Sequence, residues 1–248
     1  MARLGREARQ KVARTATLLP DAAEGRYVPR CAMEPNAAPL PLSTPLARPA
    51  IGGSTRLSCG GTEFVLEAVR GGHALVCSDG REARRFAVGL APGSELAVEL
   101  RVPRLPVRLV TRDTLALAPQ ARLRGYVQVA LVPTIVCRTP TGAARVLIEL
   151  PPRDLEPEWD DRQGTVLRAV SALHVRFPVR GASPKVVVPI RLVNPTTDVA
   201  CPGHVPLTLL DGGLQSMRGS IVVAPLRMVW NGEQLVPVAG RHRAEIAR

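Results

Sequence analysis

The sequence predicts an all-β protein, an antiparallel β-sandwich built as one large sandwich or two in tandem, with a proline-rich N-terminal arm. Short apolar or alternating runs recur along most of the chain, which is typical of half-buried strands. Clusters of Gly, Pro, Asn and Asp separate these runs at intervals of about 8 to 12 residues, as in sandwiches and barrels. A chain of 248 residues, 46% of them hydrophobic, can bury such a core without disulfides.

The N-terminal part of the chain does not follow this pattern. Residues 2–14 carry Leu4, Ala8 and Val12 at helical spacing among basic residues, so we expect at most a short helix there. Residues 32–53 contain five prolines, and proline fixes φ and removes a backbone donor. We therefore expect an extended arm over this part rather than a folded element.

Strands are expected from residue 55 to residue 150, each ended by a turn signal. The signals are GG, RGG, SDG, PGS and PTG, in which glycine supplies positive φ and proline presets its own φ. Between them the apolar residues alternate or run continuously. The expected strands are 55–59, 62–69, 74–77, 82–88, 94–102, 107–118, 123–138 and 143–150.

The C-terminal part repeats the same pattern after one ambiguous segment. In TVLRAVSALHVRF, Val166, Val170 and Leu173 fit a helical stripe, whereas alternation from Leu167 to Phe177 fits a strand. We favour the strand. The expected strands of this part are 166–179, 185–193, 204–210, 220–230 and 234–238.

Prolines lie in or near five of the apolar runs: LVPTIV, VVPIRL, HVPLTL, VAPLRM and LVPVAG. Proline cannot donate to a central ladder of hydrogen bonds. Each instance therefore predicts an edge strand, a bulge or a strand that passes from one sheet to another. A sandwich with bent strands accommodates all of them.

A domain boundary is predicted at residues 151–164, PPRDLEPEWDDRQG, where the alternation stops and acidic residues collect. We interpret this segment as an acidic linker. It divides a β domain at residues 54–150 from a second β domain, or the second half of one sandwich, at residues 165–248. Residues 1–53 are the basic N-terminal segment and the Pro/Ala-rich arm.

The net charge indicates possible classes of ligand, and the cysteines indicate the cellular compartment. The formal net charge of +12 comes from 31 Arg and only 2 Lys, a bias typical of a GC-rich genome or a thermophilic background. A positive total attracts phosphate backbones, acidic membranes or acidic proteins. Cys77 and Cys137 close apolar runs, as reduced core cysteines do, which favours a cytoplasmic protein. No apolar run reaches the roughly 20 residues that span a bilayer, so no membrane insertion is expected.

The sequence lacks the standard catalytic signatures. G-x-S-x-G, G-x-x-x-x-G-K-[ST], G-x-G-x-x-G and H-E-x-x-H are all absent. We therefore predict a non-enzymatic protein with no catalytic residues and no cofactor. The alternative is an enzyme whose site is assembled from distant residues such as His174, Asp160 and Asp161, which sequence spacing cannot reveal.

Two motifs resemble parts of metal sites. In Cys201-Pro202-Gly203-His204, a type II turn with Gly203 at positive φ brings the cysteine and the histidine within about 7 Å. Zinc needs four ligands, and the sequence offers no second local pair. The acidic residues at 154–161 lack the spacing of a calcium loop. We predict no metal site, a tight turn at CPGH and a solvated acidic connection that offsets nearby arginines.

Arginines are concentrated in residues 101–150, which carry eight Arg against two acidic residues. In RVPRLPVRLVTR the side chains of Arg104, Arg108 and Arg112 share parity, so one extended strand places them on a single face about 13 Å apart. Arg122 and Arg124 follow in RLRGYVQVAL, beside Tyr126. Such a face suits phosphate contacts, although the chain has few aromatic residues for stacking. The candidate polyanion-binding residues are Arg104, Arg108, Arg112, Arg122 and Arg124.

The run LALAPQARLRGYVQVALVPTIVCRTPTGAARVLIEL and the later KVVVPIRLV share an order of elements: an apolar strand, a proline turn, a long strand and a further strand. Over Glu95 to Leu192 this order resembles an archaeal family of β-rich proteins of unknown function. The resemblance implies an archaeal, cytoplasmic source with a thermophilic background. It implies no site residues.

Two hypotheses of function follow. The first is a non-enzymatic protein-interaction module that binds a protein partner, or forms a homo-oligomer, through edge strands or the proline-rich arm. It follows from the abundant strand pattern and the poor catalytic inventory. The alternative is binding of a polyanion such as a nucleic acid through the arginine-rich strand face.

Overall fold

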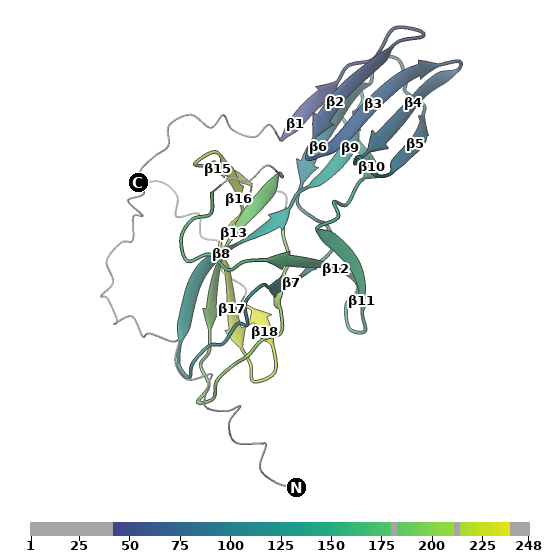
Figure 1. The fold of residues 1–248 in the computed structure, drawn as a ribbon. Coiled ribbons are helices and arrows are strands. Elements are labelled where there is room, and N and C mark those ends of the chain that lie inside the picture. Colours follow the sequence, from purple (N-terminus) through teal and green to yellow (C-terminus); the bar gives the residue numbers. More distant parts are fainter. Residues whose placement is uncertain (1–41, 180–182, 211–213, 239–248) are drawn as a thin grey trace. The chain divides into compact units, whose positions relative to one another are not determined.

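The computed structural model describes residues 42–179, 183–210 and 214–238 (Figure 1). These ranges contain 18 strands and no helix, which confirms the predicted all-β fold. The described part of the chain therefore offers no helix able to cross a membrane. The helix expected at residues 2–14 and the arm up to residue 41 lie outside the described residues.

Two four-stranded antiparallel sheets contribute to the first hydrophobic core. The meander sheet has the order β2 (Ser54–Cys59), β3 (Thr62–Val69), β4 (Gly72–Ser78) and β5 (Ala83–Val88). The β9 sheet has the order β1 (Ser43–Leu46), β6 (Glu95–Arg101), β9 (Val132–Arg138) and β10 (Ala144–Glu149). Phe64 and Leu75 of the meander sheet lie in one buried cluster with Val98 and Ile135 of the β9 sheet. Alternation along these strands directs one side chain in two into that core.

The other two sheets contribute to the second core. The β7 sheet has the order β11 (Leu155–Asp160), β12 (Gly164–Ser171), β7 (Val107–Thr111) and β14 (Val205–Leu207). The β13 sheet has the order β15 (Gln215–Met217), β16 (Ser220–Val222), β13 (Lys185–Val193), β17 (Leu226–Trp230) and β18 (Leu235–Pro237), and β8 (Arg122–Ala130) also pairs with β13. Leu109, Val127, Val188 and Leu207 are buried in this core. Within the described residues most strand pairs are antiparallel, and β12 with β7, β13 with β16 and β13 with β17 are parallel.

Three strand prolines lie where the prediction places them, at edge strands or at a passage between sheets. Near Pro133 the chain passes from β8, in the β13 sheet, to β9, in the β9 sheet. Pro189 contradicts the prediction because it lies inside the central strand β13. It is tolerated between the residues that pair with β16 and those that pair with β17, where the missing donor interrupts neither ladder. Pro206 and Pro237 lie on the edge strands β14 and β18.

Several elements differ from the expectation. Strands β1, β11 and β15 were not expected, and β1 shows that the arm is wrongly predicted as unfolded from Ser43 to Leu46, where it pairs with β6. The expected strands at 107–118 and 166–179 are shorter, ending at Thr111 and Ser171. Residues 123–138 and 220–230 each divide into two strands. The segment from Thr165 is a strand, as favoured.

The acidic segment at residues 151–164 contains strand β11, so its interpretation as a linker outside the sheets is wrong. The expectation that its acidic residues offset nearby arginines is confirmed by their ion pairs with Arg108 and Arg168. Strands β7 and β8, which precede this segment in the chain, pair with β12 and β13, which follow it. The described residues all belong to one compact unit. The division of the chain into domains at this segment stays a prediction.

Candidate functional site

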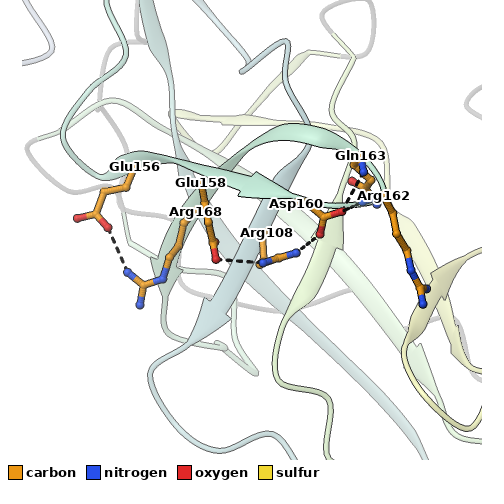
Figure 2. Close-up of polar contacts among 7 residues, drawn as sticks. All are labelled: Arg108, Glu156, Glu158, Asp160, Arg162, Gln163 and Arg168. Atoms are coloured by element: carbon orange, nitrogen blue, oxygen red, sulfur yellow. Dashed lines mark hydrogen bonds and ion pairs between the residues drawn. The ribbon is translucent and has the colours of Figure 1, made fainter.

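An ion-pair ladder covers the outer side of the β7 sheet (Figure 2). The register places Glu156 of β11 opposite Arg168 of β12, and Arg168 opposite Arg108 of β7. Arg168 Nη1 lies 3.2 Å from Glu156 Oε2, and Arg108 Nη1 donates to Glu158 Oε1 at 3.1 Å. The other end of the Arg108 guanidinium contacts Asp160. Opposite charges on neighbouring strands stabilise a sheet, so β11 supplies the carboxylates that neutralise these two arginines.

Asp160 is held in its ionised form by the turn that follows β11. Its Oδ1 accepts hydrogen bonds from the backbone N–H groups of Arg162 and Gln163, at 2.8 and 2.9 Å. These two bonds, and then the charge of Arg108, hold the pKa of Asp160 below its ordinary value. Asp160 is therefore a fixed anion that positions Arg108, with both carboxylate oxygens occupied.

The arginines expected to share one strand do not do so. Strand β7 begins at Val107 and ends at Thr111, so Arg104 and Arg112 lie outside it and the predicted line of three guanidinium groups is wrong. Arg104 Nε lies 2.9 Å from Glu149 Oε1. Arg112 is exposed, and its backbone N–H donates to the Ser171 carbonyl. Arg104 and Arg108 are thus already paired with carboxylates.

A different set of arginines meets on the β13 sheet. Arg124 of β8 lies opposite Arg191 of β13, and Arg191 lies opposite Arg227 of β17. Neighbouring strands are about 4.8 Å apart, so the three residues form a row across the sheet. Arg122, two residues from Arg124, has the same parity and lies on the same face. The arginine face consists of Arg122, Arg124, Arg191 and Arg227.

No described carboxylate neutralises the arginine face. None of its four side chains forms an ion pair or hydrogen bond with a described residue, and Arg191 Nε is buried without an acceptor there. Burial, and then the charges of Arg124, Arg122 and Arg227, lower the pKa of Arg191. Like charges directly opposite each other destabilise a sheet. The arginine face is therefore a concentrated positive site without a carboxylate partner in the part of the chain that the structure describes.

An aromatic pair lies beside the arginine face. Tyr126 follows Arg124 by two residues on β8 and shares its face. Its ring centroid lies 5.5 Å from that of Phe177, with the ring planes at 70°. The Arg218 guanidinium carbon lies 5.7 Å from the Phe177 centroid, over the ring. Arg122 and Arg124, which were expected beside Tyr126, therefore share its face of β8, whereas the contacts with Phe177 were not expected.

The residues proposed for an assembled enzyme site separate into two places. Asp160 and Asp161 line a cavity of about 580 Å³ together with His204. His174 lies elsewhere, where its backbone pairs with that of Tyr126. Burial, and then the charge of Arg108, lower the pKa of His204, which favours a neutral imidazole at pH 7. No hydrogen bond or ion pair joins Asp160 to His204 among the described residues, so a carboxylate–histidine pair is not formed there.

The CPGH motif differs from its prediction in one respect. Gly203 does not adopt positive φ, so the turn is not of type II. Cys201 is exposed and precedes the edge strand β14. Within the described ranges no three His, Cys, Asp or Glu side chains are grouped as metal ligands would be.

Sequence reasoning missed Arg191 and Arg227, two of the four residues of the arginine face. Each stands alone in an apolar run, in VVPIRLV and in PLRMVW. A single arginine on the outer side of a strand is common and carries no signal by itself. Only the register of β8, β13 and β17 places the two beside Arg124.

Comparison with models of protein families, with curated proteins and with solved structures finds no match.

Proposed function

We propose that the protein binds a polyanion through the arginine face. The observation that carries the proposal is the row of Arg124, Arg191 and Arg227, opposite one another on three strands without a described carboxylate. Like charges on neighbouring strands repel each other and lower the stability of the fold. A ligand with several phosphate or sulfate groups offsets this repulsion, because each guanidinium can donate two parallel hydrogen bonds to such a group.

The proposal modifies the set of binding residues. Arg122 and Arg124 remain in it, and Arg191 and Arg227 join them. Arg104 and Arg108 leave it because Glu149, Glu158 and Asp160 already neutralise them. A cytoplasmic location, which the cysteines favour, belongs to the same proposal because nucleic acids and other phosphate polymers occur there.

The test compares two triple variants with the same change in net charge. The first variant removes three exposed members of the arginine face and carries Arg122→Gln, Arg124→Gln and Arg227→Gln. The control removes three arginines elsewhere, of which two are exposed and Arg168 is half-buried, and carries Arg104→Gln, Arg145→Gln and Arg168→Gln. We expect affinity for inorganic polyphosphate to fall in the first variant and to stay near the wild-type value in the control. Equal losses in both would show that net charge alone binds the polymer and would refute the proposal.

A second candidate function is contact with another protein through Trp159. This side chain lies on the edge strand β11 and is 71% exposed, and tryptophan is enriched at the centres of protein interfaces. Pro157 on the same strand removes a backbone donor from the edge. The contact is therefore proposed for the side chain rather than for addition of a strand. A self-association measured by sedimentation that persists unchanged in Trp159→Ser would exclude it.

A further inference from the structure

The surface around Tyr126 distinguishes between classes of polyanion. The register of β8 with β13 runs without a bulge from Arg122 to Ala130. Arg122, Arg124 and Tyr126 therefore point to the same side, while Val127 and Val129 are buried in the core on the other. Two residues along a strand span about 6.7 Å. The aromatic side chain is thus the immediate neighbour of the arginine row.

The chain segment after β12 positions Phe177 against Tyr126. The backbones of Tyr126 and His174 exchange hydrogen bonds of 2.8 and 2.9 Å. Gly125 permits this approach, because a Cβ atom there would lie 2.9 Å from the His174 carbonyl oxygen. Phe177 follows three residues later and meets Tyr126 in an edge-to-face contact. Both rings are half-buried, so part of each remains accessible to a ligand.

Resting on the proposed function, we infer that the polyanion is a single-stranded nucleic acid, whose phosphates contact the arginine face while a base stacks at the Tyr126–Phe177 pair. Base stacking on aromatic rings beside a basic track is how proteins bind single strands without reading sequence. The Arg218 guanidinium, which already lies over Phe177, is a second planar group on which bases stack.

Other polyanions leave the aromatic pair unused. Polyphosphate and sulfated sugars have no planar aromatic group to stack. A duplex keeps its bases paired and stacked inside, and it exposes mainly its phosphates to a sheet surface. The chain has only seven aromatic residues, two Trp, two Tyr and three Phe. Two of the seven meet directly beside the arginine row, which a purely electrostatic site does not require.

The test compares ligands that carry the same phosphates with and without bases. The probes are a fluorescent oligothymidylate of about 15 nucleotides, an abasic strand of the same length, the corresponding duplex and inorganic polyphosphate. One stacked base predicts that the full chain binds oligothymidylate about 5- to 150-fold more tightly than the abasic strand. This comparison needs no variant, so it stands even if a substitution unfolds the protein.

The matched variant is Tyr126→Leu with Phe177→Leu, which keeps an apolar surface and removes the rings. We expect oligothymidylate affinity to fall to that of the abasic strand, with abasic and polyphosphate affinities unchanged. Equal affinity of the wild type for oligothymidylate and the abasic strand, or tighter binding of the duplex, would overturn the inference and leave the proposed function intact. Absence of binding to every probe at low salt would refute the proposed function itself.

Discussion

The β7 and β13 sheets both carry arginines on their outer sides. Those of the β7 sheet are paired with carboxylates, whereas those of the β13 sheet lie beside other arginines. On the β7 sheet, strand β11 supplies Glu156, Glu158 and Asp160 to Arg168 and Arg108. On the β13 sheet, the strands that flank Arg191 supply two further arginines. The fold can therefore neutralise a basic face with an acidic edge strand. No described strand supplies carboxylates to the arginine face, and the proposal that this face binds a ligand rests on that difference.

The largest expected effect comes from giving the arginine face the carboxylates that the β7 sheet has. In Arg124→Glu with Arg227→Glu, the guanidinium of Arg191 lies between two carboxylates. We expect polyanion affinity to fall by at least about 100-fold at low salt, while the free energy of unfolding rises by about 0.5–1 kcal/mol. Fluorescence anisotropy and urea unfolding measure the two quantities.

The control for that experiment is Arg104→Glu with Arg145→Glu, which changes the net charge equally. A loss of affinity in the control as large as in the test variant would mean that the two faces do not differ. A test variant that is less stable than the wild type would contradict the view that the arginine row is strained by its own charge.

The opposite experiment removes a cation from the paired face. Arg108→Gln leaves Glu158 and Asp160 side by side without the guanidinium between them. We expect the free energy of unfolding to fall by about 1–2 kcal/mol, because partly buried charged groups lose hydrogen bonds. Polyanion affinity should stay within a factor of about two, since one distant charge contributes little through screening. Urea unfolding and anisotropy on the same sample would decide, and a loss of affinity with unchanged stability would reverse the assignment of the two faces.

The stability of the ion-pair ladder should depend on pH through Asp160. The folded pKa of Asp160 is lower than its ordinary value of 3.8, so its contribution to stability is fully present above that value and is lost as pH falls through the lower folded pKa. In Asp160→Asn that part of the pH dependence should be absent. Urea midpoints measured from pH 5 downward test this, and curves of identical slope for the two proteins would contradict it.

The smallest effect is expected for the exposed end of the ladder. The Arg168–Glu156 pair is open to solvent on both sides, and such pairs contribute about 0–1 kcal/mol. Arg168→Gln should therefore change neither stability nor binding measurably. A clear loss of polyanion affinity in this variant would show that paired arginines also serve the ligand.

The all-β fold and most strand positions could be predicted because alternation and turn residues are local signals. The strand prolines were informative for the same reason, because Pro133 marks the passage from one sheet to another and Pro206 and Pro237 lie on edge strands. Strand β11 was missed because its outward residues are acidic and Pro157 interrupts it, so it lacks the apolar alternation of a half-buried strand. Its charges make sense only beside Arg108 and Arg168.

The candidate site was only partly predictable. Arg122 and Arg124 could be selected because they are close in sequence and share parity on β8. Arg191 and Arg227 could not, since they are distant in sequence and the register of β13 with both neighbours is a property of the folded sheet. The same limit explains the error at Arg104, Arg108 and Arg112, where regular spacing suggested one strand and β7 proved shorter.

The salt dependence of binding tests the central claim most directly. If the four arginines each neutralise one phosphate, log Kobs for single-stranded oligothymidylate should fall with log [salt] at a slope of about −2.8. Removing Arg227 alone, as Arg227→Gln, should reduce the size of that slope by about 0.7, while Arg104→Gln should leave it unchanged. Equal slopes for all three proteins, or no binding at low salt, would contradict the assignment of the arginine face as the polyanion site.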